Sequence, residues 1–499
     1  MNRFCLGIWL LSLSTLAVST NALAQAEADR FSAAGYYRIM TRPDFQGGNG
    51  KLGEWNLYGR LLNEGPYGIL NLRYYFVLPD ATNTEPWAVV NVRLEGSSFE
   101  NADTGNGNFN FFHFSQLYVE AGNILLKNVT WRIGTLDYYP GDLGLYDMRP
   151  AELFYDTVGI SGTYKTGKFD FLFGAGDAGY AIRGTNYDTI FSTGAWARYR
   201  ITPHLEIGLG GQGYFEPSIA GNQQAPYQTP GVTYVDYYRK EVVQNYLLAN
   251  PGMEDQFPGP AARSSSSGRA VWYLGFGGFG PVMWDSLYGY YMLRHPDNYY
   301  VENYQGKDYT IYIHDLTDQR TELLLGNELD FHIIPGHLDG AFAQLIGQDR
   351  NPDNTQVAGE DNRNFASVVL RTQAYLTDRV HYLFETSFAR EHSLNGNLWR
   401  EHVDSVFTST NGLSDPRGLS FGDTDTRYTW QGKTGFVFNP SGKGIYNRPS
   451  LRLLYGVQYS NQQEAFGNSF NQNLSQYNYF PDVERHWHHV VALEAEGWF

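Results

Sequence analysis

Three aromatic residues stand close to charged residues, a combination suited to binding a polar solute that also has an apolar face. Tyr36 precedes Arg38 by two residues, Tyr67 follows the run Arg60-Leu61-Leu62-Asn63-Glu64, and Trp498 lies near the end of the chain. Aromatic faces bind the apolar C–H face of a pyranose, while guanidinium and carboxylate groups bind hydroxyls. For any one of these aromatics alone, a structural or membrane-interface role is the simpler interpretation. The combination of all three with charged residues favours a binding path.

The segment that carries Trp498 has two different faces. Side chains two residues apart lie on the same face of a strand. One face suits lipid and the other suits water, as in a strand of a transmembrane β-barrel. The lipid-type set is Val491, Leu493, Ala495, Gly497 and Phe499, and the other set is Ala492, Glu494, Glu496 and Trp498.

The same alternation recurs along the whole chain, in segments of about 9 to 13 residues separated by Gly, Asn, Asp and Pro clusters. Leu70 and Leu72, for example, alternate with Asn71 and Arg73. We predict an all-β fold, a transmembrane antiparallel β-barrel of about 18 strands, within the usual range of 8 to 26. Closure would make the first and last strands neighbours and bring Tyr36 beside Trp498. A β-sandwich or β-propeller would also alternate.

Connection lengths alternate as well, which is typical of such barrels. Tight connections, at 165–168, 201–204 and 376–379, would lie on the periplasmic side. Long polar connections, at about 216–269 and 392–427, would be extracellular loops. A sandwich or propeller explains this alternation less easily than a barrel does.

The N-terminal residues 1–24 have the pattern of a secretory signal peptide, with Arg3, an apolar run and a small-residue cleavage site at Ala22-Leu23-Ala24. Residues 25–499 would then form one domain, the barrel. Cys5 is the only cysteine and would leave with the signal. The net charge of −16 argues against a nucleic-acid partner, which needs a positive surface. We expect no cofactor.

Other constellations favour neither catalysis nor a metal site. His486 and His488 share one strand face at a spacing that could bind zinc weakly, but a solvated rim is the simpler interpretation. We find no Ser-His-Asp order or metalloprotease motif that the strand pattern would support. We therefore expect a protein that is not an enzyme, although a hydrolase with its site on the long loops and a surface receptor stay open as alternatives.

Several local motifs resemble the maltoporin family of sugar-specific outer-membrane porins, which includes the sucrose porins. The resemblance runs along most of residues 25–499 and is weakest in the loops. The stretch from Gly134, with its two aspartates, is similar to the start of that family's inward-folded third loop, here at about 135–156. The matching segments are Gly35-Tyr36-Tyr37-Arg38, the run 60–64 followed by Tyr67, 134–147 with Asp142 and Asp147, Asn447 to Arg452, and the Glu-x-Trp-aromatic end.

The resemblance implies a homotrimer of 18-stranded barrels in the bacterial outer membrane, which passes oligosaccharides along a line of aromatics. By position, Tyr36, Tyr67 and Trp498 would belong to the aromatic line. The polar track at the constriction would comprise Arg38, Arg60, Asp142, Asp147 and Arg149, the last where the family has a tyrosine.

The chain departs from the family pattern at the constriction. Pro140 stands where the family has an arginine, Ile69 where it has a glutamate, and Ala366, next to Phe365, where another aromatic is expected. Maltodextrin specificity therefore does not carry over. A porin for another glycan and a general or differently selective porin are both compatible with these residues.

Overall fold

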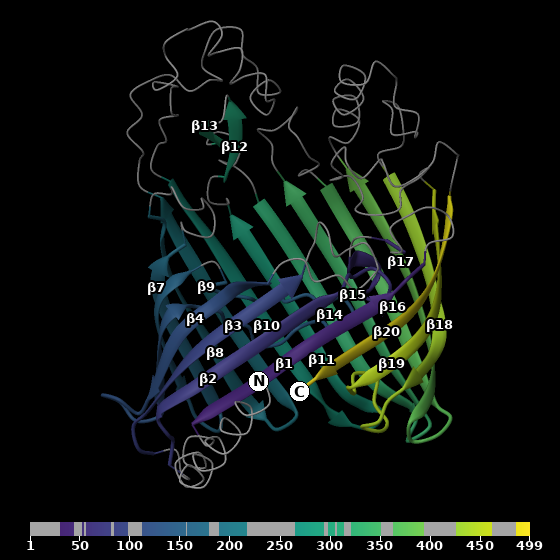
Figure 1. Ribbon diagram of the computed structural model, residues 1–499, viewed down its shortest axis with the longest axis horizontal. Helices are drawn as coiled ribbons and strands as arrows, with labels where there is room; N and C mark the ends of the chain where they lie inside the picture. Colours follow the sequence, from purple (N-terminus) through teal and green to yellow (C-terminus); the bar gives the residue numbers. More distant parts are fainter. Residues whose placement is uncertain are drawn as a thin grey trace, which may run out of the picture.

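The strands of the protein form one closed antiparallel barrel in the computed structural model (Figure 1). The structure describes residues 30–43, 52–53, 56–80, 84–97, 112–155, 157–178, 189–216, 265–293, 298–304, 307–313, 321–350, 363–393, 426–461 and 486–499. The expected signal segment 1–24 and nearly all of the two longest connections lie outside these residues. Within them, no helix is long and apolar enough to cross a membrane.

The barrel wall has 18 strands, as the alternation predicts. Each strand pairs antiparallel with the next along the chain, β11 pairs with β14, and β20 pairs with β1 to close the wall. The wall strands are β1 (Phe31–Thr41), β2 (Tyr67–Val77), β3 (Trp87–Ser97), β4 (Phe112–Gly122), β5 (Val129–Thr135), β6 (Val158–Lys165), β7 (Phe169–Asp177), β8 (Phe191–Thr202), β9 (Leu205–Glu216), β10 (Ser265–Phe279), β11 (Val282–Leu293), β14 (Thr321–Ile334), β15 (Leu338–Arg350), β16 (Arg363–Tyr375), β17 (Val380–Ser393), β18 (Thr426–Phe438), β19 (Ser450–Ser460) and β20 (Trp487–Trp498).

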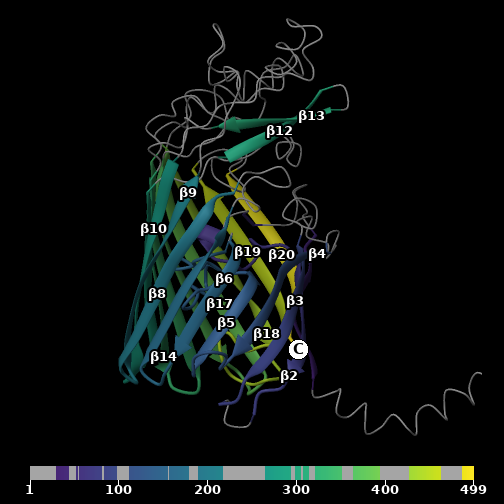
Figure 2. The same ribbon diagram turned by 90° about the vertical axis from the view of Figure 1, so that its left-hand side faces the viewer.

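Two further elements lie in the connections. The hairpin β12 (Asn298–Tyr304) and β13 (Lys307–Ile313) forms a separate two-stranded sheet between β11 and β14. Figure 1 and Figure 2 place it beyond the end of the barrel at which β11 ends and β14 begins. A single 3-10 turn, η1 (Asn56–Tyr58), lies in the connection between β1 and β2.

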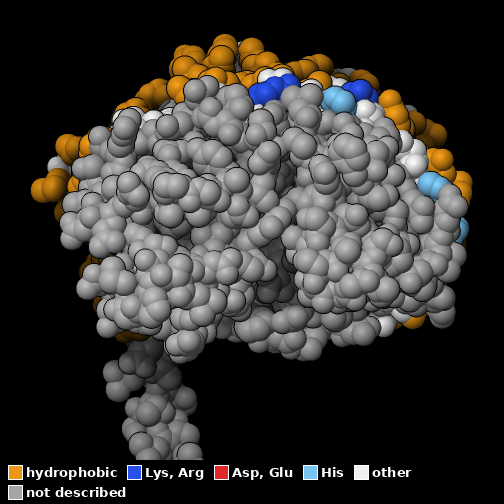
Figure 3. Space-filling model, turned by 90° about the horizontal axis from the view of Figure 1, so that it is seen from above, with side chains coloured by type: hydrophobic (Ala, Val, Ile, Leu, Met, Phe, Trp, Pro, Cys, Tyr) orange, Lys and Arg blue, Asp and Glu red, His pale blue; other side chains and the backbone are white. Residues whose placement is uncertain are grey.

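The two faces of β20 separate as their residue types predict. Leu493 is 45% exposed on the outer face, whereas Glu494 and Glu496 are buried on the inner one. Phe499 continues the ladder onto β1 by exchanging both backbone hydrogen bonds with Gly35. Its ring lies over Gly35, where an added Cβ would stand 2.3 Å from the ring, so only glycine fits there. Apolar side chains likewise form the outline of the described wall seen from above (Figure 3).

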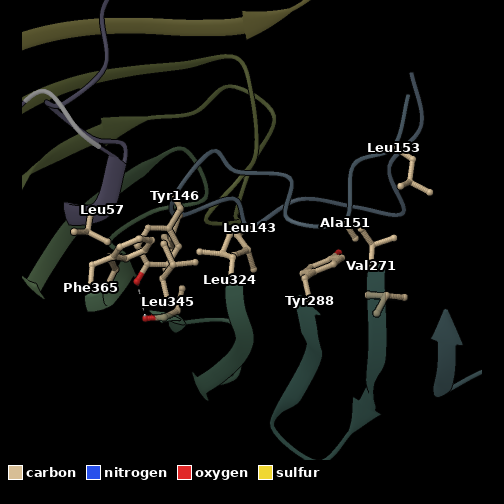
Figure 4. Packing of buried hydrophobic residues seen from close by; sticks show 14 of the residues in the cluster. Leu57, Leu143, Tyr146, Ala151, Leu153, Val271, Tyr288, Leu324, Leu345 and Phe365 are labelled. Carbon is tan, nitrogen blue, oxygen red and sulfur yellow. Dashed lines mark hydrogen bonds between the residues drawn. The ribbon is translucent and has the colours of Figure 1, made fainter. Parts of the chain in front are cut away.

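Three connections fold into the barrel and pack against the inner wall. We name them the first inner loop (residues 52–53 and 56–66), the second inner loop (residues 136–155 and 157) and the inner turn (residues 439–449). Figure 4 shows Tyr146 and Leu143 of the second inner loop against Leu345 and Leu324 of the wall. The family resemblance indicates only the second inner loop. The first inner loop is an additional one.

The first inner loop also corrects the expectation of a solvated histidine rim. Its Leu52 packs in a cluster with Leu383 and Val490 of the wall. His488, on the inner face of β20, is fully buried, with Nδ1 3.4 Å from the Leu52 carbonyl oxygen. That interpretation was wrong for His488, because its covering loop comes from a distant part of the chain, whereas His486 is half-buried.

Candidate functional site

The first inner loop is held against β16, β17 and β18 by hydrogen bonds to buried ion pairs of those strands. Lys433 lies 2.8 Å from Glu385, which also pairs with Arg371, and its ammonium donates to the Tyr58 carbonyl oxygen at 3.0 Å. Gly59 packs against the same carboxylate, where an added Cβ would lie 2.9 Å from an oxygen, and its φ of +83° favours glycine. Without the loop, the buried Lys433 ammonium would lose the Tyr58 carbonyl as a hydrogen-bond acceptor. Burying a charged group without its partners is costly, so this contact fixes the loop in place.

The second inner loop is joined to the first loop, to the wall and to the inner turn. The Leu145 amide donates to Glu328 of β14 at 2.9 Å, and the Leu145 carbonyl accepts from the Arg60 amide at 2.8 Å. Tyr446 of the inner turn donates to the other oxygen of Glu328 at 2.6 Å. One carboxylate thus anchors the second inner loop and the inner turn directly, and the first inner loop through Leu145, and this arrangement positions Arg60.

These segments leave a cavity of about 1660 Å³ inside the barrel. Its walls come from β1 to β5, β10, β11, β14 to β16 and β20, together with the inner loops and the inner turn. The lining is rich in tyrosine, arginine and carboxylate side chains. All eight residues that the sequence proposes for a site border it: Tyr36, Tyr67, Trp498, Arg38, Arg60, Asp142, Asp147 and Arg149.

The three aromatics lie together where the barrel closes. Tyr36 pairs in register with Trp498, and their ring centroids are 4.5 Å apart. On β2, the other strand that pairs with β1, the ring centroid of Tyr67 lies 5.9 Å from that of Tyr36. Trp498 is 59% exposed on the inner face of β20. Its ring therefore presents a surface to the cavity, whereas Tyr36 is buried between its neighbours.

A group of charges surrounds one carboxylate beside these rings. We call Glu496 with Tyr36, Arg60, Arg448 and Arg452 the Glu496 cluster. Tyr36 donates to Glu496 Oε1 at 2.6 Å, and the guanidinium groups of Arg60 and Arg448 lie 2.8 and 2.7 Å from the same oxygen. Arg452 lies 2.7 Å from Oε2. Two of these guanidinium groups also pair with a second acid, because Arg60 lies 3.3 Å from Glu64 and Arg452 lies 3.9 Å from Glu494.

A second acid pair lies next to this cluster. Glu64 bonds to Arg38 and lies 3.3 Å from Arg60, while Asp147 lies 4.0 Å from Arg38. Burial raises the pKa of Glu64 to about 7, although Arg38 and Arg60 oppose the rise. Burial also acts to raise the pKa of Asp147, but Arg60 and Arg38 outweigh it and hold that pKa below its usual value. Near neutral pH, Asp147 is ionised and Glu64 titrates.

The other two predicted polar residues occupy different parts of the cavity. Asp142 has a raised pKa because it is buried and faces the negative charge of Asp147. Arg149 pairs with Glu152 at 3.3 Å and lies 4.0 Å over the ring of Tyr139. Arg149 thus belongs to its own loop and does not join the Glu496 cluster.

The positions that depart from the family pattern divide between the two faces of the wall. Pro140 and Ile69 both line the cavity. Ala366 is exposed on the outer face of β16, whereas its neighbour Phe365 lines the cavity, with the Arg363 guanidinium 5.3 Å from its ring centre. The aromatic on this strand is therefore Phe365.

Sequence reasoning missed a second group of aromatics, on β10 and β11. Tyr273 and Tyr288 stack with centroids 4.9 Å apart, and Arg269 lies 4.3 Å over the ring of Tyr290. These residues also line the cavity, as does Trp284. The signal was present, because Trp284, Tyr288 and Tyr290 stand at even spacing and so share one strand face.

Comparisons with known proteins give distant likenesses in structure only. No family model matches the chain, and no curated protein matches it. OccK2 (OpdF) of Pseudomonas aeruginosa is 9% identical, with a TM-score of 0.44 over 94% of this chain and 97% of that one. OprB of Pseudomonas putida is 10% identical, with a TM-score of 0.41 over 96% of each chain. OmpT of Vibrio cholerae in its trimer form is 7% identical, with a TM-score of 0.37 over 94% and 99%.

Proposed function

We propose that this protein is an outer-membrane porin through which small solutes diffuse passively. A closed wall that is apolar outside and encloses a charged, aromatic cavity supports this role. In a bilayer such a wall leaves no strand edge unpaired. The protein would be exported through the signal segment 1–24, surrounded by outer-membrane lipid, and assembled as the homotrimer that the family resemblance implies. Diffusion requires no covalent step and no cofactor.

We propose further that the pore selects carbohydrates. The observation that carries this proposal is the contact of Tyr36 with Tyr67 and Trp498 directly beside the Glu496 cluster. Stacking on the exposed Trp498 ring would hold the apolar face of a sugar, and the paired charges would exchange hydrogen bonds with its hydroxyls. Each such bond is weak enough to be replaced as the solute moves, which transport requires.

A differently selective porin on the same fold is the second candidate. The charges that line the cavity favour it, because Arg38 on β1 and Arg60 on the first inner loop lie together, while Glu328 and Asp330 lie on β14. An unequal distribution of charge would select small ions or charged solutes. The absence of an acid at Ile69 and of a base at Pro140 also points away from a maltodextrin-type constriction.

Current through purified protein in a planar bilayer separates these candidates. A sugar-selective pore gives ion current that neutral oligosaccharides block in a concentration-dependent way. Current that no glycan in a panel of gluco-, galacto- and fructo-oligosaccharides can block would select the second candidate. Folded protein that inserts but carries no current would refute a porin of either kind.

A further inference from the structure

Three polar side chains lie on the outer face of neighbouring strands in the wall. Asp285 of β11, Asn327 of β14 and Gln344 of β15 alternate with residues that face inward, such as Ser286 and Glu328 on the cavity. None of the three borders the cavity. We call Asp285, Asn327 and Gln344 the outer polar patch.

Two of these residues lie halfway along their strands. Asn327 is the seventh of fourteen residues in β14, and Gln344 is the seventh of thirteen in β15. The two are direct partners in the antiparallel register, so their side chains are adjacent. Ile346, the next outward residue of β15, is 55% exposed, as expected of a wall that faces lipid. In a membrane, the patch would reach the middle of the hydrocarbon layer.

The patch is only partly satisfied by its own wall. The Asn327 amide donates to Asp285 and, at 3.2 Å, to the Ser286 carbonyl oxygen. The Gln344 side chain is exposed and makes no hydrogen bond with another residue that the structure describes.

Outward threonines of the wall behave differently from Gln344. The hydroxyls of Thr193, Thr386 and Thr434 each donate to a backbone carbonyl of a neighbouring strand. The hydroxyls of these threonines therefore have hydrogen-bond partners within the wall, whereas the Gln344 amide has none among the residues that the structure describes.

Hydrocarbon cannot hydrogen-bond an amide or a carboxylate, and leaving such groups unmet in an apolar medium is costly. We propose that the face formed by β11, β14 and β15 contacts the same face of a second copy of this chain. The second copy is the occupant that fits, because each amide is both donor and acceptor and Asp285 is an acceptor, so the patch complements itself. This two-fold contact differs from the ring contacts of a trimer. It rests on the membrane placement proposed above.

Cysteine cross-linking of the full chain in reconstituted liposomes tests the contact, since Cys5 is the only native cysteine. In a Cys5→Ser background, Ile346→Cys, which keeps the outer polar patch intact, should form a covalent dimer under mild oxidation. The matched control is Leu453→Cys on β19, which is also outward, 53% exposed and four strands away from β15 along the wall. Cross-linking at 346 no stronger than at 453 would overturn the proposal, because the liposomes contain only this protein and lipid.

A second pair of variants tests the same contact without a covalent bond. Gln344→Leu should weaken association in the membrane by about three- to thirtyfold, the effect of one or two membrane hydrogen bonds. It should leave the free energy of unfolding of the barrel unchanged or raise it. Gln348→Leu, an outward glutamine of the same strand that hydrogen-bonds Asn364, is the control and should not alter association. Equal association of both variants and wild type would contradict the contact.

Conductance of the same liposomes distinguishes failure of this contact from failure of the porin. Conducting protein that does not cross-link at 346 would refute the contact alone. Protein that cross-links but carries no current would refute the porin and leave the contact standing.

Discussion

Removing the Trp498 ring should weaken sugar binding without closing the pore. The ring is 59% exposed to the cavity and touches the protein through Tyr36, at a centroid distance of 4.5 Å. An aromatic pair contributes about 0.5–1.5 kcal/mol beyond its buried area. Trp498→Ala should therefore raise the dissociation constant of a blocking oligosaccharide by about two- to tenfold. Tyr36 and Tyr67 remain, so block should weaken and not vanish.

The assay for Trp498→Ala is sugar-induced current block in planar bilayers, titrated for each variant. Open-pore conductance should be unchanged or higher, because alanine leaves more room at the cavity wall. Trp487→Ala is the matched control, since Trp487 lies on the same strand but is 49% exposed on the outer face. Unchanged sugar affinity in Trp498→Ala, or an equal loss in Trp487→Ala, would refute the role given to the inner aromatic face.

Three further perturbations test the outer face, the acid pair and the inner loop. Leu493→Arg should impair assembly by roughly 2–4 kcal/mol if it lies near mid-membrane, and a yield of folded protein equal to that of Leu493→Ala would contradict the face assignment. Lowering the pH from about 8 to 6 should neutralise Glu64, whose pKa is about 7, and so reduce cation selectivity, measured as a reversal potential in a salt gradient; Glu64→Gln should remove part of this change. Lys433→Met should remove the ion pair with Glu385 and the hydrogen bond to the Tyr58 carbonyl oxygen. The free energy of unfolding should fall on the order of 3 kcal/mol, and current noise should increase as the first inner loop loosens. Urea unfolding and current noise equal to wild type would show that other contacts hold the loop.

The wall of the barrel was predictable because its rules are local. Alternation places Leu493 outside and Glu494 inside from the sequence of one strand. Closure is a property of the whole sheet, and it requires only that the first and last strands meet. The contact between Tyr36 and Trp498 follows from these two facts, although 462 residues separate them. What such an argument cannot supply is the solute, since it says which face a ring lies on and not what binds there.

The interior was less predictable because its contacts are not local. Asn63 reaches Gln431 across 368 residues of chain, and Tyr58 reaches Glu391 across 333. No periodicity connects residues so far apart. The buried position of His488 could not be deduced either, since its cover is Leu52 from the other end of the chain.

One sequence signal does point to the first inner loop, and it is apolar. The connection between β1 and β2 contains four leucines, which are not expected in a solvated extracellular loop: Leu52, Leu57, Leu61 and Leu62. All four are buried against the inner wall, and each buried leucine stabilises by about 1.5–3 kcal/mol relative to an exposed one. The hydrophobic effect therefore drives the loop inward, while the hydrogen bonds of Tyr58 with Lys433 and Glu391 select where it settles, because these buried charged groups would otherwise lose a partner. Arg60 reaches Glu496 only because this loop folds inward, so the binding surface depends on leucines that never touch the solute.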